Sequence, residues 1–179
     1  RVRAAMTSVQ ITGDGIVGLF NGLGPNREAT VRLLEAMLEA DASAVGGLIA
    51  VEPGVLPDGE PMAYYAGVAK RGVGDRDLLA TGYDVHAQAW YRRTVAADAP
   101  WWSEPYYNET AGGRWMTTLN MPLRGRDGAR LGMVSLDVPV ARWEELVEPL
   151  RRIQGQRPAL FAPQGTVVLH PDPGVALKT

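Results

Sequence analysis

The chain has 179 residues, of which 46% are hydrophobic and 21% are charged, and these fractions indicate a globular protein rather than a disordered or fibrous one. Its length suits one domain of ordinary size, or one domain with a piece of another. The net charge of −2, without any block of Lys and Arg, gives no basis for binding nucleic acid or anionic lipid. The absence of cysteine excludes a disulfide scaffold and a thiolate metal site.

The first element that we expect is a long helix over residues 2–23. Apolar residues recur there at alternating spacings of four and three, on one stripe of a helix: Val2, Met6, Val9, Gly13, Ile16, Phe20 and Leu23. Gly13 and Gly15 weaken this helix by about 1 kcal/mol each relative to alanine. The stripe indicates a helix that packs on the core of its own chain or, alternatively, one that pairs with a second copy.

A second helix and three strands are expected next. Asn26 caps the second helix, and its inward face is formed by Val31, Leu34 and Leu38. Apolar runs bounded by turn residues predict the three strands, at residues 45–51, 62–70 and 78–83.

A short helix, a hairpin and an amphipathic helix complete the order of elements. The short helix is expected over residues 85–95, and the hairpin joins residues 115–123 and 130–138 around Asp127-Gly128. Apolar residues at helical spacing mark the last helix: Val140, Trp143, Val147 and Leu150. One antiparallel sheet with helices against it is an α+β fold, and a long ligand-lining insertion separates its third and fourth strands.

Large aromatic residues are concentrated between positions 83 and 137. Four of the five tryptophans and four of the six tyrosines fall inside this segment. Aromatic walls with a few placed polar groups are the usual composition of a small-molecule site. The segment therefore predicts a ligand pocket.

A carboxylate ends the second strand of the hairpin. Asp137 shares a face of that strand with Met133 and Ser135. An unpaired buried charge is unfavourable, so Asp137 either caps the helix that begins near Val140 or receives a cationic group. Aromatic faces near a carboxylate favour an ammonium group.

No enzyme motif accompanies these residues. The sequence has no Gly-x-Ser-x-Gly elbow, no phosphate-binding loop and no His-Glu-x-x-His, and no ligand pattern surrounds His86 or His170. An enzyme that uses Asp137 with Glu104 or His86 is the rival to a binding domain. A pure dimerisation module with a filled core is a second rival.

Two runs of sequence carry a family resemblance. They are Trp102-Ser103-Glu104-Pro105-Tyr106 and, after a strand and an Asp-Gly turn, Gly132-Met133-Val134-Ser135-Leu136-Asp137. They resemble the Cache domains of bacterial sensors, and the chain is most similar to the membrane-distal half of a double Cache domain. The resemblance implies a PAS-like antiparallel sheet with a long N-terminal helix and flanking helices. It also implies three parts, which are a stalk helix at 1–24, a membrane-distal module at 25–155 and the start of a membrane-proximal module at 156–179.

The resemblance further implies a set of ligand-binding residues. Many double Cache domains bind amino acids through a Tyr, an Arg five residues later, a Trp-Tyr pair, a Pro-Tyr tyrosine and a late Asp. The candidate set in this chain, with Asn108 included, is Tyr83, Gln88, Trp90, Tyr91, Tyr106, Asn108 and Asp137. The residues that hold the ligand's amine in the family are retained, whereas Gln88 replaces the arginine that holds its carboxylate. A glutamine cannot form a bidentate charged contact, and the arginines considered as substitutes are Arg92, Arg93 and Arg114.

The sequence thus predicts the extracytoplasmic, periplasmic sensor domain of a bacterial inner-membrane signalling receptor, without catalytic activity, cofactor or metal. The expected ligand is a small cationic amine or an amino-acid-like metabolite. The alternatives are an amino acid or organic acid in the same pocket, and a small hydrolase or lyase that uses Asp137.

We also expect neighbouring segments in the full-length receptor. A membrane helix precedes Arg1 in this view, and a second sheet module, another membrane helix and a cytoplasmic output domain follow Thr179. Kinase, chemoreceptor, cyclase and phosphatase outputs are all compatible with such a sensor. The full-length receptor is expected to be a homodimer, whereas the fragment alone can be monomeric.

Overall fold

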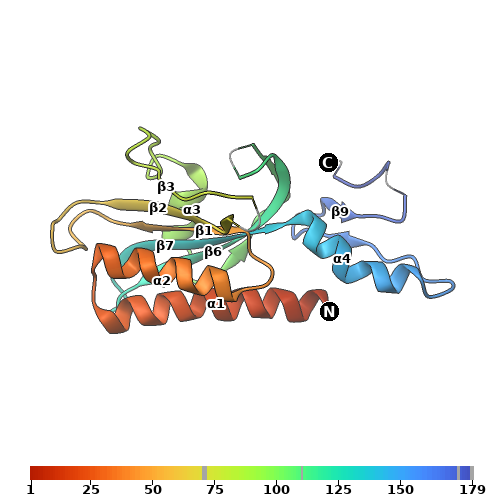
Figure 1. Ribbon diagram of the computed structural model, residues 1–179, viewed down its shortest axis with the longest axis horizontal. Helices are drawn as coiled ribbons and strands as arrows, with labels where there is room; N and C mark the ends of the chain where they lie inside the picture. Colours follow the sequence, from red (N-terminus) through yellow and green to blue (C-terminus); the bar gives the residue numbers. More distant parts are fainter. Residues whose placement is uncertain (70–71, 110, 173, 178–179) are drawn as a thin grey trace.

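The computed structural model describes residues 1–69, 72–109, 111–172 and 174–177, and Figure 1 shows its layers. The elements in chain order are α1 (Val2–Leu23), α2 (Arg27–Ala40), β1 (Gly46–Val51), β2 (Met62–Gly67), β3 (Arg76–Asp77), α3 (Ala89–Ala96), β4 (Trp101–Trp102), β5 (Tyr106–Asn108), β6 (Arg114–Arg124), β7 (Arg130–Pro139), α4 (Val140–Arg151), β8 (Leu160–Phe161) and β9 (Val167–Leu169).

One antiparallel sheet forms the middle layer of the molecule. Its strand order is β3-β2-β1-β7-β6-β4, and β5 pairs with the same edge of β6 as β4. The two longest strands, β6 and β7, form the expected hairpin, and β7 continues directly into α4. The β8–β9 hairpin is a separate sheet at the end of the molecule where α4 and the N-terminus lie (Figure 1).

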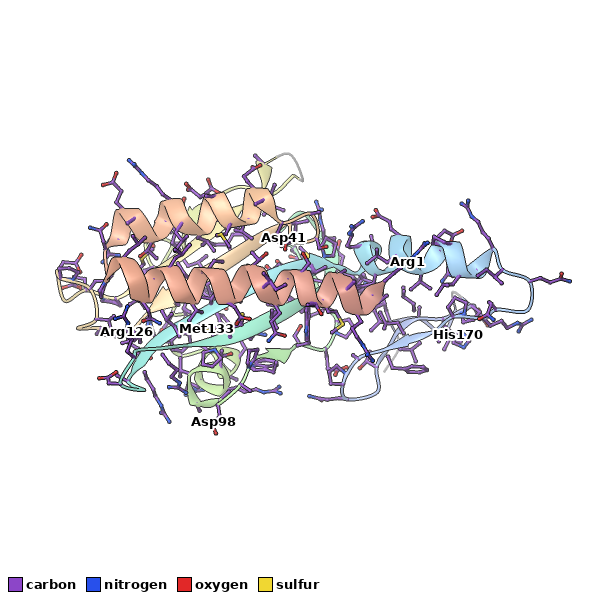
Figure 2. All side chains as sticks on the ribbon, turned by 90° about the horizontal axis from the view of Figure 1, so that it is seen from below. Arg1, Asp41, Asp98, Arg126, Met133 and His170 are labelled. Carbon is purple, nitrogen blue, oxygen red and sulfur yellow. The ribbon has the colours of Figure 1, made fainter. Side chains whose placement is uncertain are left out.

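Helices α1 and α2 lie side by side across one face of the sheet (Figures 1 and 2). Helix α1 packs on β6 and β7, and α2 packs on β1 and β2. The predicted cap of α2 is confirmed, because the side chain of Asn26 accepts a hydrogen bond of 2.9 Å from the amide of Ala29. Leu34 and Leu38 are buried beneath this helix, as the spacing predicts.

The apolar stripe of α1 is occupied within the chain along most of its length. Val9, Ile16 and Phe20 are buried in the same cluster as the sheet residues beneath them. At Gly13 a Cβ atom would lie 2.1 Å from the Sδ atom of Met121, so glycine allows the helix to lie close to β6. The buried part of the stripe is therefore unavailable for pairing with a second copy. The homodimer expected for the intact receptor stays a prediction.

The two faces of β7 have different roles because successive side chains of a strand point in opposite directions. Val134, Leu136 and Val138 belong to the core under α1 and α2. Met133, Ser135 and Asp137 point to the opposite face, which is covered by α3 and the segments around it. This alternation places Asp137 on the face that carries the site.

The third strand does not lie where the sequence predicts it. Strand β3 is the two-residue segment Arg76–Asp77, whereas residues 78–82 form turns. The side chain of Asp77 accepts hydrogen bonds from the amides of Leu79 and Ala80, and this local bonding competes with strand formation. The second predicted strand ends at Gly67, and its expected last residue, Lys70, is outside the described residues.

The segment between β3 and β6 also differs in detail from the prediction. Helix α3 begins at Ala89 rather than at residue 85, because Asp84 accepts a hydrogen bond from the amide of Ala87 in a turn before the helix. Residues 101–102 and 106–108, for which no strand is expected from the sequence, form β4 and β5 on the edge of β6.

Candidate ligand-binding site

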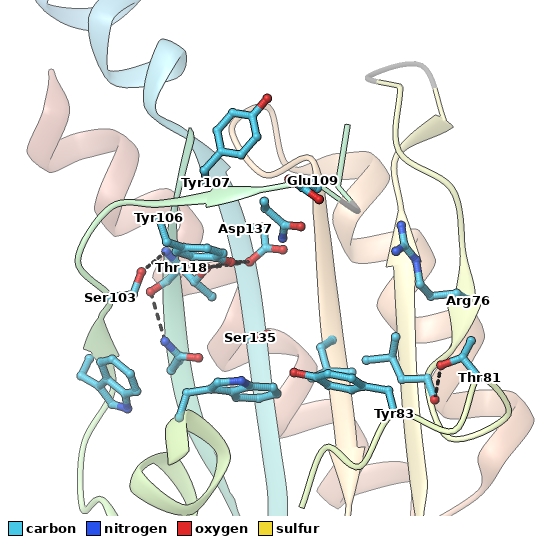
Figure 3. A pocket seen from close by; sticks show the side chains of 16 residues that line it. Arg76, Thr81, Tyr83, Ser103, Tyr106, Tyr107, Glu109, Thr118, Ser135 and Asp137 are labelled. Carbon is cyan, nitrogen blue, oxygen red and sulfur yellow. Dashed lines mark hydrogen bonds between the residues drawn. The ribbon is translucent and has the colours of Figure 1, made fainter. Parts of the chain in front are cut away.

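A cavity of about 820 Å³ lies on the face of the sheet opposite α1 and α2 (Figure 3). Its floor comes from β1, β6 and β7, and its walls come from β3, α3, β4, β5 and the turns after β3. The lining residues are Leu48, Arg76, Leu78, Thr81, Tyr83, Trp90, Trp101, Ser103, Tyr106, Tyr107, Asn108, Glu109, Thr118, Asn120, Ser135 and Asp137.

The floor of the cavity follows from the register of the sheet. Cross-strand partners lie side by side on one face. One row of such partners crosses the six strands β3-β2-β1-β7-β6-β4 in the order Arg76, Tyr65, Leu48, Ser135, Asn120 and Trp101. Asp137 and Thr118 are partners in the next row along the same face. The sheet therefore brings residues that are far apart in the sequence into one surface.

Asp137 places a buried carboxylate on this surface, and the residue is 4% exposed. It accepts hydrogen bonds from three hydroxyl groups, those of Tyr65 (3.0 Å to Oδ2), Thr118 (2.7 Å to Oδ1) and Tyr106 (3.4 Å to Oδ1). Burial raises the pKa of Asp137 above its usual range, while the three hydroxyl donors and the charge of Arg76 act in the opposite direction. The carboxylate is therefore oriented by neutral donors and faces the cavity.

The two tyrosines beside Asp137 are held as hydrogen-bond donors. Burial is the main cause that raises the pKa of Tyr65 and of Tyr106, and the charge of Asp137 adds to it. The hydroxyl of Tyr106 also lies 2.8 Å from the Oγ1 atom of Thr118. Both phenols consequently stay protonated over the whole physiological range of pH.

Gly46 allows Tyr65 to reach Asp137. It lies on β1 between these two residues, as the cross-strand partner of Asp137. A Cβ atom at Gly46 would lie 2.3 Å from the hydroxyl oxygen of Tyr65 and 2.7 Å from its Cζ atom. The missing side chain leaves the space through which the phenol passes over β1.

Gly46→Ala is therefore expected to lower the free energy of unfolding by roughly 1–3 kcal/mol, the usual cost of an extra methyl group in a packed site. The new Cβ atom forces the ring of Tyr65 away from Asp137. Urea denaturation measures the change, and Tyr65→Phe, which removes the hydroxyl and keeps the ring, is the companion variant. Unchanged stability in Gly46→Ala would show that Tyr65 can move freely and does not depend on this glycine.

Five of the seven candidate residues from the sequence line the cavity: Tyr83, Trp90, Tyr106, Asn108 and Asp137. Tyr91 does not line it, because the residue is 2% exposed and its hydroxyl donates a hydrogen bond of 2.8 Å to Glu52. Gln88 does not line it either, since it precedes α3 and its side-chain amide donates to the carbonyl of Asp84 (2.9 Å).

The alternative role of Asp137 as a helix cap is not what the structure shows. The N-cap residue of α4 is Pro139, and this helix has no side-chain cap hydrogen bond. The Asp137 carboxylate instead accepts hydrogen bonds from hydroxyl groups on β2, β5 and β6 of the sheet.

Two charged residues of the cavity, Arg76 and Glu109, were not in the candidate set from the sequence. The substitutes considered for the lost arginine do not line the cavity; Arg93, for example, lies with its Cζ atom 3.6 Å from the ring centroid of Trp101. Arg76 was missed because it lies between the strands expected at 62–70 and 78–83, whereas β3 is formed by Arg76–Asp77. One sequence pattern does indicate a polar face of the sheet at this place. Polar residues alternate there with apolar ones along β6 and β7, namely Thr118, Asn120 and Ser135.

The outer side of the segment 101–105 contacts a different part of the molecule. The ring of Trp102 packs edge-on against Trp143 of α4, with centroids 5.7 Å apart. The side chain of Glu104 accepts a hydrogen bond of 2.7 Å from the amide of Gln164 in the β8–β9 hairpin. Trp101 and Ser103, which alternate with these two residues along the chain, line the ligand cavity.

The two rival interpretations of the sequence find no support in this geometry. Neither Glu104 nor His86 lines the cavity beside Asp137, and the imidazole of His86 packs against the ring of Tyr91. A filled core is excluded by the cavity between Trp90 and Asp137. Among the described residues, no group of three or more His, Asp or Glu side chains is placed to hold a metal ion. No helix in the described ranges has the length and apolar character needed to cross a membrane.

Solved structures with the same fold include an extracellular domain of a histidine kinase and the ligand-binding domains of chemoreceptors. An extracellular domain assigned to a histidine kinase, soHK1S-Z6, has a TM-score of 0.76 at 22% identity, over 98% of this chain and 67% of that one. The ligand-binding domain of the Pseudomonas aeruginosa PAO1 amino acid chemoreceptor PctC, in complex with GABA, has a TM-score of 0.69 at 22% identity, over 99% and 72%. That of PctB from the same organism, in complex with L-Arg, has a TM-score of 0.68 at 19% identity, over 97% and 66%.

The family of the chain follows from its sequence. Residues 30–145 match the model of the family described as "Methyl-accepting chemotaxis protein-like, first PDC sensor domain". The antiparallel α+β fold with a long N-terminal helix, expected from the Cache resemblance, is confirmed, and so is the placement in the extracytoplasmic part of a receptor. The chain belongs to the family of first PDC sensor domains of methyl-accepting chemotaxis protein-like receptors.

Proposed function

We propose that this sensor domain binds a small molecule with a positively charged nitrogen, and that it does so without catalysing a reaction. The nitrogen lies against Asp137 and Tyr106, with the rings of Trp90 and Trp101 on the cavity wall. Binding of GABA and of L-Arg by domains of the same fold supports a ligand with an amino group.

The observation that carries this proposal is the environment of Asp137. Its carboxylate is buried, and its hydrogen-bond donors are neutral hydroxyl groups that orient it without neutralising its charge. A desolvated carboxylate gains more from a cation than from any neutral group. Glu109 adds a second carboxylate to the lining. The charged groups of the described lining are thus two carboxylates and one guanidinium, that of Arg76. The cavity is therefore suited to a ligand with at least one cationic centre.

The aromatic lining supports the same ligand class. Tyr83, Trp90, Trp101 and Tyr106 all contribute to the cavity wall. A cation over an aromatic face gains roughly 0.5–2 kcal/mol beyond what its burial provides. Tyr91 is not part of this wall. Of the Trp-Tyr pair that the sequence predicts around the ligand, only Trp90 lines the cavity.

We further propose the domain arrangement expected from the sequence. Residues 1–24 are a stalk helix, residues 25–155 are the membrane-distal module, and residues 156–179 open a membrane-proximal module. The separate β8–β9 sheet after α4 supports the last boundary. A homodimeric receptor with a cytoplasmic output domain is part of the same proposal.

A thermal-shift screen of amines, amino acids and organic acids tests the proposed ligand class. A ligand at 100 times its dissociation constant is expected to stabilise the fold by about 2.7 kcal/mol. Amines or amino acids should give this shift, and organic acids without an amino group should not. Stabilisation by organic acids alone, unchanged in Asp137→Asn, would overturn the proposal.

A separate assay tests the absence of chemistry. Compounds that bind are incubated with the domain and followed for hydrolysis or elimination products. Turnover that is lost in Asp137→Ala would replace the sensor with an enzyme that uses this carboxylate.

A further inference from the structure

Arg76 places a positive charge on the wall of the cavity, on the side of β3. It is half-buried, and among the lining residues that the structure describes it is the cationic one. Its Cζ atom lies 5.3 Å from the centroid of the Tyr65 ring, which is its cross-strand partner. In Figure 3, Arg76 lies on one side of Asp137 and Tyr106 lies on the other.

Tyr65 connects the two opposite charges of the site. The guanidinium of Arg76 lies over its ring, and its hydroxyl donates to Asp137 at 3.0 Å. One tyrosine side chain therefore contacts both charged groups. Burial raises the pKa of both Tyr65 and Asp137, and the charge of Arg76 acts in the opposite direction on each.

The orientation of Arg76 follows from the strand on which it lies. Its neighbours Asp75 and Asp77 bind backbone amides, those of Gly67 at 2.7 Å and of Leu79 at 3.0 Å. Because side chains alternate along a strand, these two carboxylates point away from the cavity while Arg76 points toward it.

We propose that Arg76 binds a carboxylate group of the ligand, so that the ligand is a zwitterion that spans Asp137 and Arg76. This inference rests on the proposed function, since Asp137 holds the ligand's nitrogen. An arginine offers two parallel hydrogen bonds to a carboxylate, whereas Gln88 is neutral and lies outside the cavity. The carboxylate-binding role has thus moved from the start of α3 to β3, and it makes Arg76 the residue that distinguishes an amino acid from a simple amine.

Isothermal titration with matched ligand pairs tests this role. Each pair consists of an amino acid and the amine that remains without its carboxylate: L-leucine with isoamylamine, L-arginine with agmatine, and GABA with propylamine. The other amino acids found in the screen are paired in the same way. For the wild type, we expect the amino acid of the best-binding pair to bind at least about ten-fold more tightly than its amine.

Arg76→Gln should remove this preference. The affinity for the amino acid is expected to fall by roughly 10- to 100-fold, and that for the amine should be unchanged, because only one of them carries a group for Arg76. Arg76→Lys keeps the charge without the two-pronged geometry and should give an intermediate affinity. Arg92→Gln, on the exposed surface of α3, is the matched control and should leave both affinities as they are.

The outcomes separate this inference from the function on which it rests. Equal wild-type affinity for both members of every pair, or equal weakening of both by Arg76→Gln, would overturn the role of Arg76 and leave the amine site at Asp137 intact. Failure of every amine and amino acid to bind the wild type would overturn the proposed function itself. Circular dichroism and the melting temperature of the empty variants show whether each one folds, and Arg76→Lys replaces Arg76→Gln if the latter does not.

Discussion

Asp137→Asn is expected to abolish amine binding while leaving the empty domain at least as stable as the wild type. Removing one partner of a buried, hydrogen-bonded charge pair costs about 3–5 kcal/mol, so the affinity should fall by about two to four orders of magnitude. The side chain of Asn has the same size, and its Oδ1 atom can accept from Thr118 as Oδ1 of Asp137 does. Its Nδ2 atom replaces Oδ2 and can donate to the hydroxyl oxygen of Tyr65, whose own hydrogen bond to Oδ2 is lost. Titration calorimetry measures the first effect, and urea denaturation measures the second.

The pH dependence of the same two proteins provides the control. Because the pKa of Asp137 is higher in the folded state than in the unfolded chain, the folded state binds more protons between the two values. The free energy of unfolding of the wild type should therefore rise, relative to that of Asp137→Asn, as the pH falls through the folded pKa. This difference should become constant below the unfolded pKa of about 3.9. Ligand affinity should fall over the same range, since the protonated carboxyl no longer attracts a cation.

A result of the opposite sign would contradict this account. If the wild type lost stability relative to Asp137→Asn on acidification, the charged form of Asp137 would be stabilising the fold. The carboxylate would then be a structural group with satisfied contacts, and its role in holding a ligand would fail.

Gly132→Ala is expected to be the most destabilising substitution at any glycine of the sheet. Gly132 has a φ angle of 144°, which favours glycine, and a Cβ atom there would lie 2.0 Å from the carbonyl oxygen of Ala50. The obstacle is the backbone of β1, so no side-chain rotation can relieve it. Gly132 also pairs with Val51 and Leu123 in the middle of the sheet. The expected loss is roughly 3 kcal/mol or more of the free energy of unfolding, measured with urea.

Gly18→Ala is the matched control, and its expected effect has the opposite sign. Gly18 lies inside α1, and a Cβ atom there would meet nothing within 4 Å. Replacing a helical glycine with alanine in open space should stabilise the domain by about 1 kcal/mol. If both variants had the same effect on stability, the clash with β1 would not be the cause of the loss in Gly132→Ala.

The parts of the site on regular elements were predictable from the sequence. The period of two along β7 puts Asp137 on the face opposite Val134 and Leu136, and this requires no knowledge of the fold. The spacing in the first helix predicts its buried face in the same way. The adjacent residues Trp90 and Tyr91 were known to point in different directions, but which one faces the cavity depends on how α3 is rotated on the sheet.

The place of Arg76 in the cavity and the short strands β3, β4 and β5 could not be predicted from the sequence, and the reason is physical. A strand of two residues, such as β3, has no periodicity, and it exists only because Arg76 and Asp77 pair with Tyr65 and Tyr64. Strands β4 and β5 likewise depend on pairing with the edge of β6. Contacts between residues far apart in the chain decide these segments, and a local pattern does not record them.

The two-sided segment 101–105 has a mechanical consequence for the receptor. Trp101 and Ser103 face the ligand cavity, whereas Trp102 packs on α4 and Glu104 holds the C-terminal hairpin. A ligand that moves the inner side chains must also displace the outer ones, because neighbouring residues of an extended chain share one backbone. The outer contacts lie at the end of the molecule where α4 and the β8–β9 hairpin are found (Figure 1). Ligand binding can therefore change the contacts of Trp102 with α4 and of Glu104 with the β8–β9 hairpin without a change in the core beneath α1 and α2.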